Sequence, residues 1–305
     1  MIVQDLIDSP VRKVRRAEQH FDALRRKMSA WKNRSVGIEI ARDDGAHSLV
    51  FVSKDVPEIP DEWTDDISDA MQNARNALDH IAYQLAILAN GYVPLDEADR
   101  RKIQFPWSKS REAFGELTKK NSKYFRHQDW TALEDLQLHN ATSNEIWGSS
   151  SSYPLHFVPF NIGVLWKLAN VDKHQEVLPL WLGVGDAHDA PPEVGGCRTS
   201  GGSIFPGRFE SGKPFAHWGF EDEMPQAIDL DELGRYLPIC FKVNGTYFEW
   251  PDAYPGMFFP VEDFETIIEG ALRAVRTVLW IFEPALRLGE HPRTARSARQ
   301  ELGWL

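Results

Sequence analysis

The chain has 305 residues, of which 42% are hydrophobic, and its 45 acidic and 34 basic side chains leave a formal net charge of −11. This length and hydrophobic content are enough to bury a large core, which excludes global disorder. The net charge excludes a uniformly basic nucleic-acid binder. The charge is uneven, however: residues 1–34 carry nine basic and four acidic side chains, so the basic excess lies at the N-terminal end.

Cysteine usage and hydropathy indicate a cytoplasmic protein. Cys197 and Cys240 are too few for a disulfide framework and lack the paired spacing of a metal site, so we expect reduced thiols. The acidic residues Asp5 and Asp8 do not fit the basic start of a signal peptide. No apolar run reaches 18 residues, and the most hydrophobic segment, 264–282, contains four charged side chains. We therefore expect no membrane partner.

The chain begins with a predicted helix over 9–34. Its apolar residues recur at alternating steps of three and four, which places them on one helical face. They are Val14, Ala17, Phe21, Leu24, Met28 and Trp31. Seven basic residues between Arg12 and Lys27 lie outside this stripe. They form either a solvated surface that faces the acidic stretch 43–69 or a strip for a phosphodiester backbone.

A β-hairpin is predicted over 35–54. Val36, Ile38 and Ile40 alternate with other residues, an Asp-Asp-Gly turn follows at 43–45, and the next apolar run is 49–52.

The segment 60–175 is predicted to be mainly helical. Its long stripe consists of Ile67, Met71, Ala74, Leu78, Ile81, Leu85 and Leu88. Shorter helices are expected near 110–118, 129–138 and 159–175. In the last of these, we expect four residues to face inward: Ile162, Leu165, Trp166 and Ala169.

Over 177–258, frequent Pro and Gly and short apolar runs predict a small antiparallel sheet inserted into the helical core. The runs are Val177–Val184, Ser203–Phe209, Pro214–Phe220, Leu237–Val243 and Tyr247–Trp250. The serine-rich residues 149–152 and the glycine-rich residues 195–202 are interpreted as loops.

The last stripe lies within 260–285 and comprises Phe264, Ile268, Ala271, Val275, Val278 and Phe282. The three long helices should bury their stripes against one another as an antiparallel bundle. The fold class is therefore α+β, with a single domain over 1–285. Residues 286–305 are expected to form a C-terminal tail on the surface.

The second long helix carries the most suggestive motif, Arg75-Asn76-Ala77-Leu78-Asp79-His80. An arginine, a following polar residue and a histidine five positions on, inside a long helix, resemble the R-x4-6-H signature of the HEPN superfamily. The string RNALDHIAYQLA, with VDKHQ at 171–175, also resembles a group of bacterial proteins that lack a firm function. This resemblance covers the helical core, and the β segment is not part of a minimal HEPN bundle.

The resemblance implies a HEPN-like bundle and a metal-independent endoribonuclease, often dimeric, that acts without a cofactor in defence or as a toxin. His80 would be the base, Arg75 would hold the phosphate, and Asn76 would position either group. This chemistry is reasonable, because a histidine can take a proton from a ribose 2′-OH near neutral pH. An arginine can also bind a phosphate through two hydrogen bonds. The expected partners are RNA or a nucleotide, and a second copy of the chain.

The spacing alone does not decide the site, because Arg15 with His20 and Arg42 with His47 have the same separation. The helical context favours the third pair. At 100° per residue, Arg75 and His80 lie about 140° apart around the helix. They can converge only through long side chains or across a second subunit.

Three further residue groups leave alternatives open. Asn76, His80 and Tyr83 share a polar helix face, which suits either a dimer interface or ordinary packing. Arg75 and Asp79 can form an ion pair while His80 bonds within the core. Asp79, Tyr83, Lys173 and His174 are candidate substrate-binding residues, although the helix dipole alone favours the last two. A metal site at His80 and His174 lacks any known ligand spacing, so no metal is expected.

Three functions thus remain open from the sequence. The first is the metal-independent ribonuclease. The second is a non-catalytic HEPN-like module that binds a nucleotide, a nucleic acid or a protein. The third is a structural or interaction protein in which Arg75, Asp79 and His80 only satisfy one another.

Overall fold

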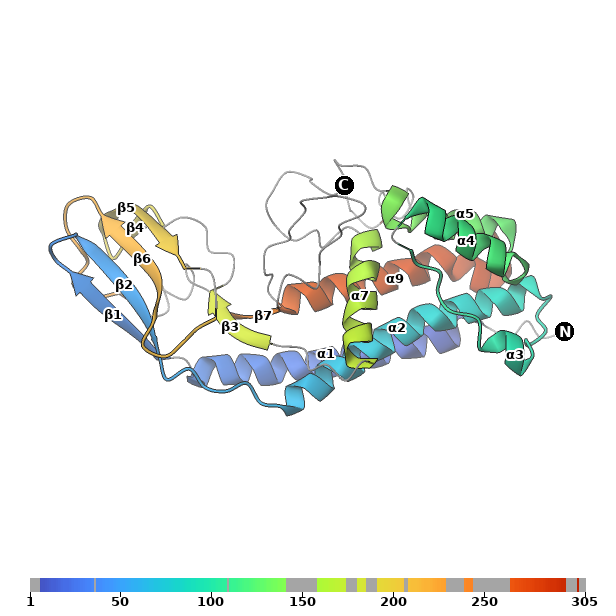
Figure 1. Cartoon of the computed structure of the whole chain (residues 1–305), viewed down its shortest axis with the longest axis horizontal. Coiled ribbons are helices and arrows are strands. Elements are labelled where there is room, and N and C mark those ends of the chain that lie inside the picture. Colours follow the sequence, from blue (N-terminus) through green and yellow to red (C-terminus); the bar gives the residue numbers. More distant parts are fainter. Residues whose placement is uncertain are drawn as a thin grey trace.

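The computed structural model describes residues 6–35, 37–108, 110–140, 158–173, 180–184, 191–205, 208–228, 239–243, 264–294 and 301. These residues form an α+β fold, with long helices toward one end and a curled antiparallel sheet at the other (Figure 1). The predictions for Val36, residues 149–152, His174 and the run 247–250 lie outside the described residues. So does the predicted tail beyond 294, apart from Glu301.

The three predicted apolar stripes form three long helices. They are α1 (Asp8–Ser35), α2 (Glu62–Ala89) and α9 (Phe264–Leu288). Every stripe residue is buried except Trp31, which is partly buried, so the predicted inward faces are confirmed. Helices α1 and α2 run in opposite directions, as expected (Figure 1).

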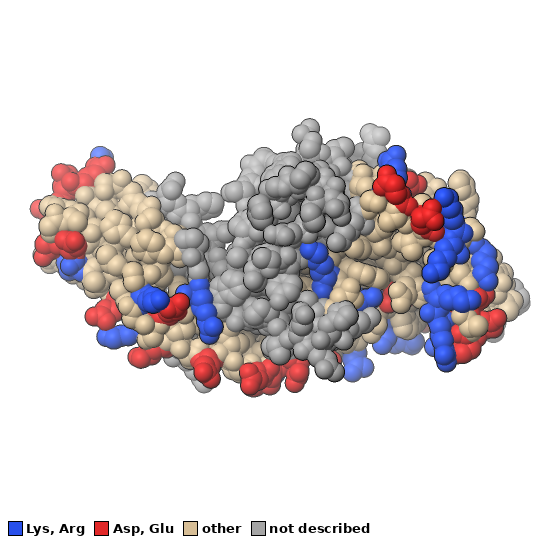
Figure 2. Space-filling view, viewed as in Figure 1, with Lys and Arg blue, Asp and Glu red and all other residues tan. Residues whose placement is uncertain are grey.

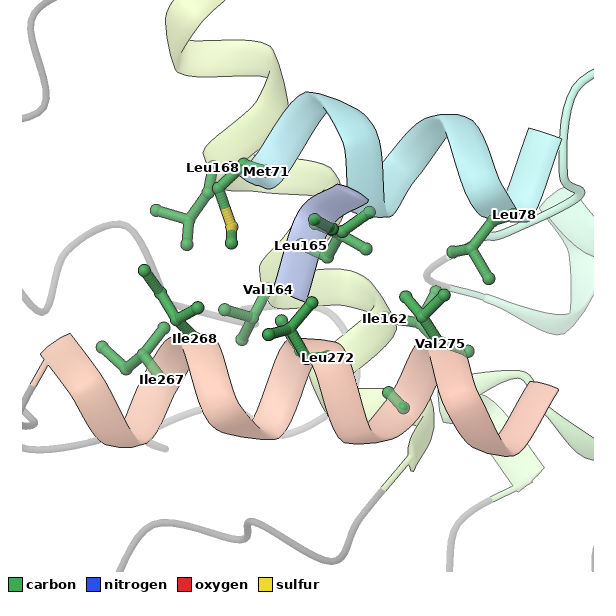
Figure 3. Close-up of a cluster of buried hydrophobic side chains, with 14 of the residues drawn as sticks. Met71, Leu78, Ile162, Val164, Leu165, Leu168, Ile267, Ile268, Leu272 and Val275 are labelled. Carbon is green, nitrogen blue, oxygen red and sulfur yellow. The ribbon is translucent and has the colours of Figure 1, made fainter. Parts of the chain in front are cut away.

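Helices α2 and α9 run in the same direction, which departs from a strictly antiparallel bundle. Along their shared core, Met71 of α2 lies near Ile268 of α9, and further on Leu78 lies near Val275 (Figure 3). The connection from α2 to α9 includes the whole β segment, which returns the chain to the starting end of α2 (Figure 1).

Helix α7 (Val158–Lys173) crosses α2 and α9 and completes the core. Ile162, Leu165 and Ala169 are fully buried, as predicted. Trp166 was also expected to face inward, but it is only half-buried. Its ring contacts Arg75 of α2 and Trp107.

Several short helices cover one end of the long ones. They are α3 (Glu97–Arg100), α4 (Arg111–Asn121), η1 (Ser122–Tyr124), α5 (His127–Asp135) and η2 (Leu138–Asn140). Helix α9 extends to Leu288 and ends at Gly289, whose φ of +71° is in the left-handed region that favours glycine. The segment expected to form a tail from residue 286 therefore begins inside a helix.

The predicted hairpin is present as β1 (Gly37–Asp43) and β2 (Ser48–Lys54). It does not stand apart from the inserted sheet. Strand β2 pairs with β6 (Pro214–Phe220), and the five-stranded sheet has the order β1-β2-β6-β5-β4. Strand β4 is Glu193–Val194, and a separate two-stranded sheet pairs β3 (Leu180–Val184) with β7 (Ile239–Val243).

The interpretation of residues 195–202 as a loop is wrong over most of its length, because β5 spans Cys197–Ile204. This strand is mostly exposed and so lacks the apolar alternation that reveals strands in sequence. It pairs with β6 across a register shift between Thr199 and Gly201. The φ of +136° at Gly201 is a backbone conformation that other residues rarely adopt, which explains a glycine at this irregularity.

An aromatic cluster joins the helices to the small sheet. Trp31 at the end of α1 and Trp63 at the start of α2 are 5.6 Å apart between ring centroids, and Phe241 of β7 lies 5.3 Å from Trp63. No described helix is long and apolar enough to cross a membrane.

Candidate functional site

Arg75, the first residue of the motif, is buried and points toward α7. Only 5% of its surface is exposed, and its Nη1 donates a 2.6 Å hydrogen bond to Oδ1 of Asn170. Its guanidinium carbon lies 4.0 Å from the ring centroid of Trp166, a cation–π contact. Burial lowers the pKa of Arg75, and the nearby carboxylate of Asp79 acts in the opposite direction. The described contacts of Arg75 thus join α2 to α7.

Asp79 has a second partner besides this charge interaction. Its Oδ1 accepts a 2.9 Å hydrogen bond from the backbone N–H of Phe105. The Phe105 side chain is fully buried, so this bond fixes the segment between α3 and α4 against α2. Asp79 therefore has a clear structural role.

His80 points toward the start of α1. Its Nδ1 lies 2.6 Å from Oγ of Ser9, and the residue is half-buried. Arg75 and His80 thus contact different helices on different sides of α2, in agreement with their expected angular separation. A single chain does not bring these two side chains together.

Positive charge surrounds His80. Its pKa is lowered first by burial and then by the charges of Lys13, Arg100 and Arg12. Arg100 also lies 5.7 Å from the ring centroid of Tyr83, which places a second motif residue beside this cluster. A histidine in such surroundings stays neutral at neutral pH, so its ring can accept a proton.

Two of these cations, Arg12 and Lys13, also border an open surface groove of about 720 Å³ on α1. It is lined by Arg12, Lys13, Arg16, Gln19, His20 and Ala23. Within the described part of the chain, Arg12, Lys13 and Arg16 form no ion pair. We call this surface, together with His80 and Arg100, the basic groove.

The far end of the predicted basic strip behaves differently. Lys27 forms an ion pair of 2.5 Å with Asp66 of the acidic stretch, and Arg25 pairs with Asp22 at 2.9 Å. Lys27 thus faces the acidic stretch, as the first interpretation expects, and Arg25 is paired within α1 itself. Among the described residues, Arg12, Lys13 and Arg16 near His80 form no such pair.

The other candidate residues are less informative. Asn76 is half-buried on α2, and Lys173 is the last residue of α7, with a side chain outside the described set. The sequence did not single out Ser9 and Arg100. No local pattern marks them, because only the packing of α1 and α3 against α2 brings them to His80.

Figure 2 shows Lys and Arg side chains gathered at the end of the molecule that carries α3, α4 and α5. Among the described residues, no group of three or more His, Cys, Asp or Glu could hold a metal ion. No family model, curated protein or solved structure matches this chain.

Proposed function

We propose that this protein binds RNA through the basic groove and that its helices form a HEPN-like core presenting this groove. The observation that carries the proposal is the cluster of Arg12, Lys13 and Arg100 around His80, next to a groove whose arginine and lysine side chains form no ion pair within the described residues. His20 of this groove lies 4.0 Å from the carboxylate of Asp69. A phosphodiester backbone supplies the missing negative charges.

The charge distribution supports a local contact. A protein of net charge −11 repels a polyanion over most of its surface, so binding depends on a small area of opposite sign. The basic groove offers lysine and arginine side chains for phosphates, with Gln19 and His20 as further hydrogen-bonding groups. In this proposal Arg75 positions α7 and does not touch the RNA. A homodimer would place two such grooves on one particle.

The test is the binding of a labelled single-stranded RNA, followed by fluorescence anisotropy in the presence of a chelator. Lys13→Gln/Arg16→Gln should weaken binding about tenfold, because two phosphate contacts are lost. Arg25→Gln/Lys27→Gln is the matched control: it removes the same charge from the same helix, where both cations already have partners. Equal losses in the two variants would overturn the proposal.

The state of His80 favours a second candidate function, cleavage of the bound RNA. A neutral histidine whose Nδ1 is held by Ser9 can take the proton from a ribose 2′-OH, which then attacks the adjacent phosphorus. Lys13 and Arg100 would stabilise the charge that develops on the phosphate.

This candidate is tested by RNA cleavage in chelator. His80→Ala should abolish cleavage while the variant stays folded and still binds RNA. Cleavage that persists in His80→Ala would show that His80 is not the base and would leave the binding function unaffected.

A further inference from the structure

A second groove, of about 810 Å³, lies between α4 and α7 on a different part of the helical end. Its walls include two indoles, Trp107 and Trp166, and the side chains of Ser110, Leu117 and Lys120. Grooves of this size with apolar walls and a few polar groups are typical of small-molecule sites. None of the residues proposed to bind RNA lines it.

The two indoles form one aromatic wall. Their ring centroids are 6.4 Å apart and their planes are inclined by 31°, and both residues are half-buried. Trp166 is held from another side by the guanidinium of Arg75 at 4.0 Å. Arg75 in turn donates a hydrogen bond to Asn170, so contacts within the fold hold Trp166 in place. An aromatic side chain that is held in place loses little conformational entropy on binding.

The polar side of the groove includes Glu116 and Lys120. Glu116 is engaged by Lys119 at 2.9 Å, whereas Lys120 forms no ion pair within the described residues. Ser110 accepts a hydrogen bond from the N–H of Ala113 to cap α4, and its hydroxyl also bonds to the carboxylate of Glu112. The groove therefore combines an aromatic wall with an ammonium group that forms no ion pair within the described residues.

We propose that this groove binds a nucleotide, with the base against the Trp107–Trp166 wall and the phosphate at Lys120. Both parts of the groove match a part of a nucleotide. A base offers a planar π face for an indole, and a phosphate offers the negative charge that would pair with Lys120. The base belongs either to a free nucleotide or to a nucleotide of an RNA strand. The site does not depend on the basic groove.

The first test titrates adenosine 5′-monophosphate into the full chain and measures heat release. Trp107→Leu should weaken binding about tenfold, because stacking on the indole is lost, whereas Trp107→Phe should retain most of the affinity. Circular dichroism checks that both variants fold.

The second test uses two exposed lysines. Lys120→Gln should weaken binding of the monophosphate but not of adenosine, which lacks the phosphate. Lys102→Gln is the control, because this lysine is paired with Asp99 and neither residue lines the groove. Both are exposed side chains, so neither change threatens the fold. If Lys120→Gln left the affinity for the monophosphate unchanged, the proposed contact between Lys120 and the phosphate would be wrong.

Single-stranded oligoadenylate distinguishes the two sources of the base. If the monophosphate binds and Trp107→Leu weakens it, the ligand is a free nucleotide. If only the oligonucleotide binds in a Trp107-dependent way, the base comes from a strand. If Trp107→Leu changes neither, the proposal is overturned. Lys13→Gln/Arg16→Gln should leave monophosphate binding unchanged. The nucleotide proposal is therefore tested separately from the proposal that the basic groove binds RNA.

Discussion

At the scale of single residues, the two ends of the Arg75–His80 motif have different roles. Arg75 is enclosed by α7, where its charge is balanced by an aromatic ring and an amide oxygen. His80 lies half-exposed among cations that would attract an anion. The spacing in the sequence predicted that the two side chains lie on different sides of α2, but not which helix packs on each side.

The lowered pKa of His80 predicts a pH dependence of stability. At a pH between the lowered pKa of folded His80 and the ordinary histidine pKa of about 6.5, His80 is protonated in the unfolded chain but neutral in the folded protein. The contribution of His80 to the free energy of unfolding is therefore complete above that ordinary pKa, and it falls as the pH drops toward the folded pKa. Urea unfolding of the wild type and His80→Gln at pH 7.5, 6.0 and 5.0 should show a smaller acid loss in the variant. Parallel curves would contradict this explanation.

Arg75→Ala should lower the free energy of unfolding by about 2 kcal/mol, because it removes a cation–π contact and leaves the half-buried amide of Asn170 without this donor. RNA affinity of the folded variant should not change. A double-mutant cycle with Asn170→Ala measures the coupling, which should be clearly non-zero. A variant of wild-type stability with weakened RNA binding would instead place Arg75 in the RNA site.

At the scale of elements, one arginine side chain, Arg126, joins the start of α5 to the end of α9. Arg126 bonds to both carboxylate oxygens of Asp129, which is fully buried, and donates to the backbone oxygens of Gly289 and Glu290. This side chain thus satisfies a buried charge and the carbonyl oxygens that follow α9.

Arg126→Ala should therefore destabilise the protein by about 3–5 kcal/mol, since Asp129 would remain buried and charged without its counter-ion. Arg101→Ala is the control: it breaks an exposed pair with Glu97 and should cost no more than about 0.5 kcal/mol. Thermal unfolding of both variants measures the difference, and similar losses would show that the Arg126 pair contributes no more than a surface pair.

Element prediction from sequence succeeded where burial is periodic. The stripes of α1, α2 and α9 lie on faces that are buried in the structure, and the alternation over 37–54 correctly predicted the hairpin. It failed at β5, whose glycines and exposed side chains carry no periodic signal. The pairing of β2 with β6 was also missed, because strand partners about 165 residues apart leave no mark in either local pattern.

The candidate site was predictable only where a local pattern marks its residues. Arg12 and Lys13 are recognisable as charges outside an apolar stripe, and His80 is recognisable from the motif that begins at Arg75. Their convergence with Ser9 and Arg100 is a tertiary contact that no local spacing encodes. The Trp107–Trp166 wall likewise joins two segments that are separate in sequence.

At the scale of the whole molecule, a small positive area on a chain of net charge −11 should make RNA binding strongly dependent on salt. Three phosphate contacts, at Arg12, Lys13 and Arg16, predict a slope of about −2 for log affinity against log salt concentration. Lys13→Gln/Arg16→Gln should reduce this slope to about −0.7. Anisotropy titrations at four salt concentrations provide the measurement. A slope near zero in the wild type would contradict a phosphate contact.

The pairing of β2 with β6 has a consequence for biosynthesis. During translation the first hairpin leaves the ribosome long before residues 214–220, so the edge of β2 stays unpaired while most of the chain is being made. Such a high contact order slows folding and exposes an aggregation-prone strand. Nascent chains released before residue 220 should therefore depend on chaperones, whereas those that contain β6 can close the sheet.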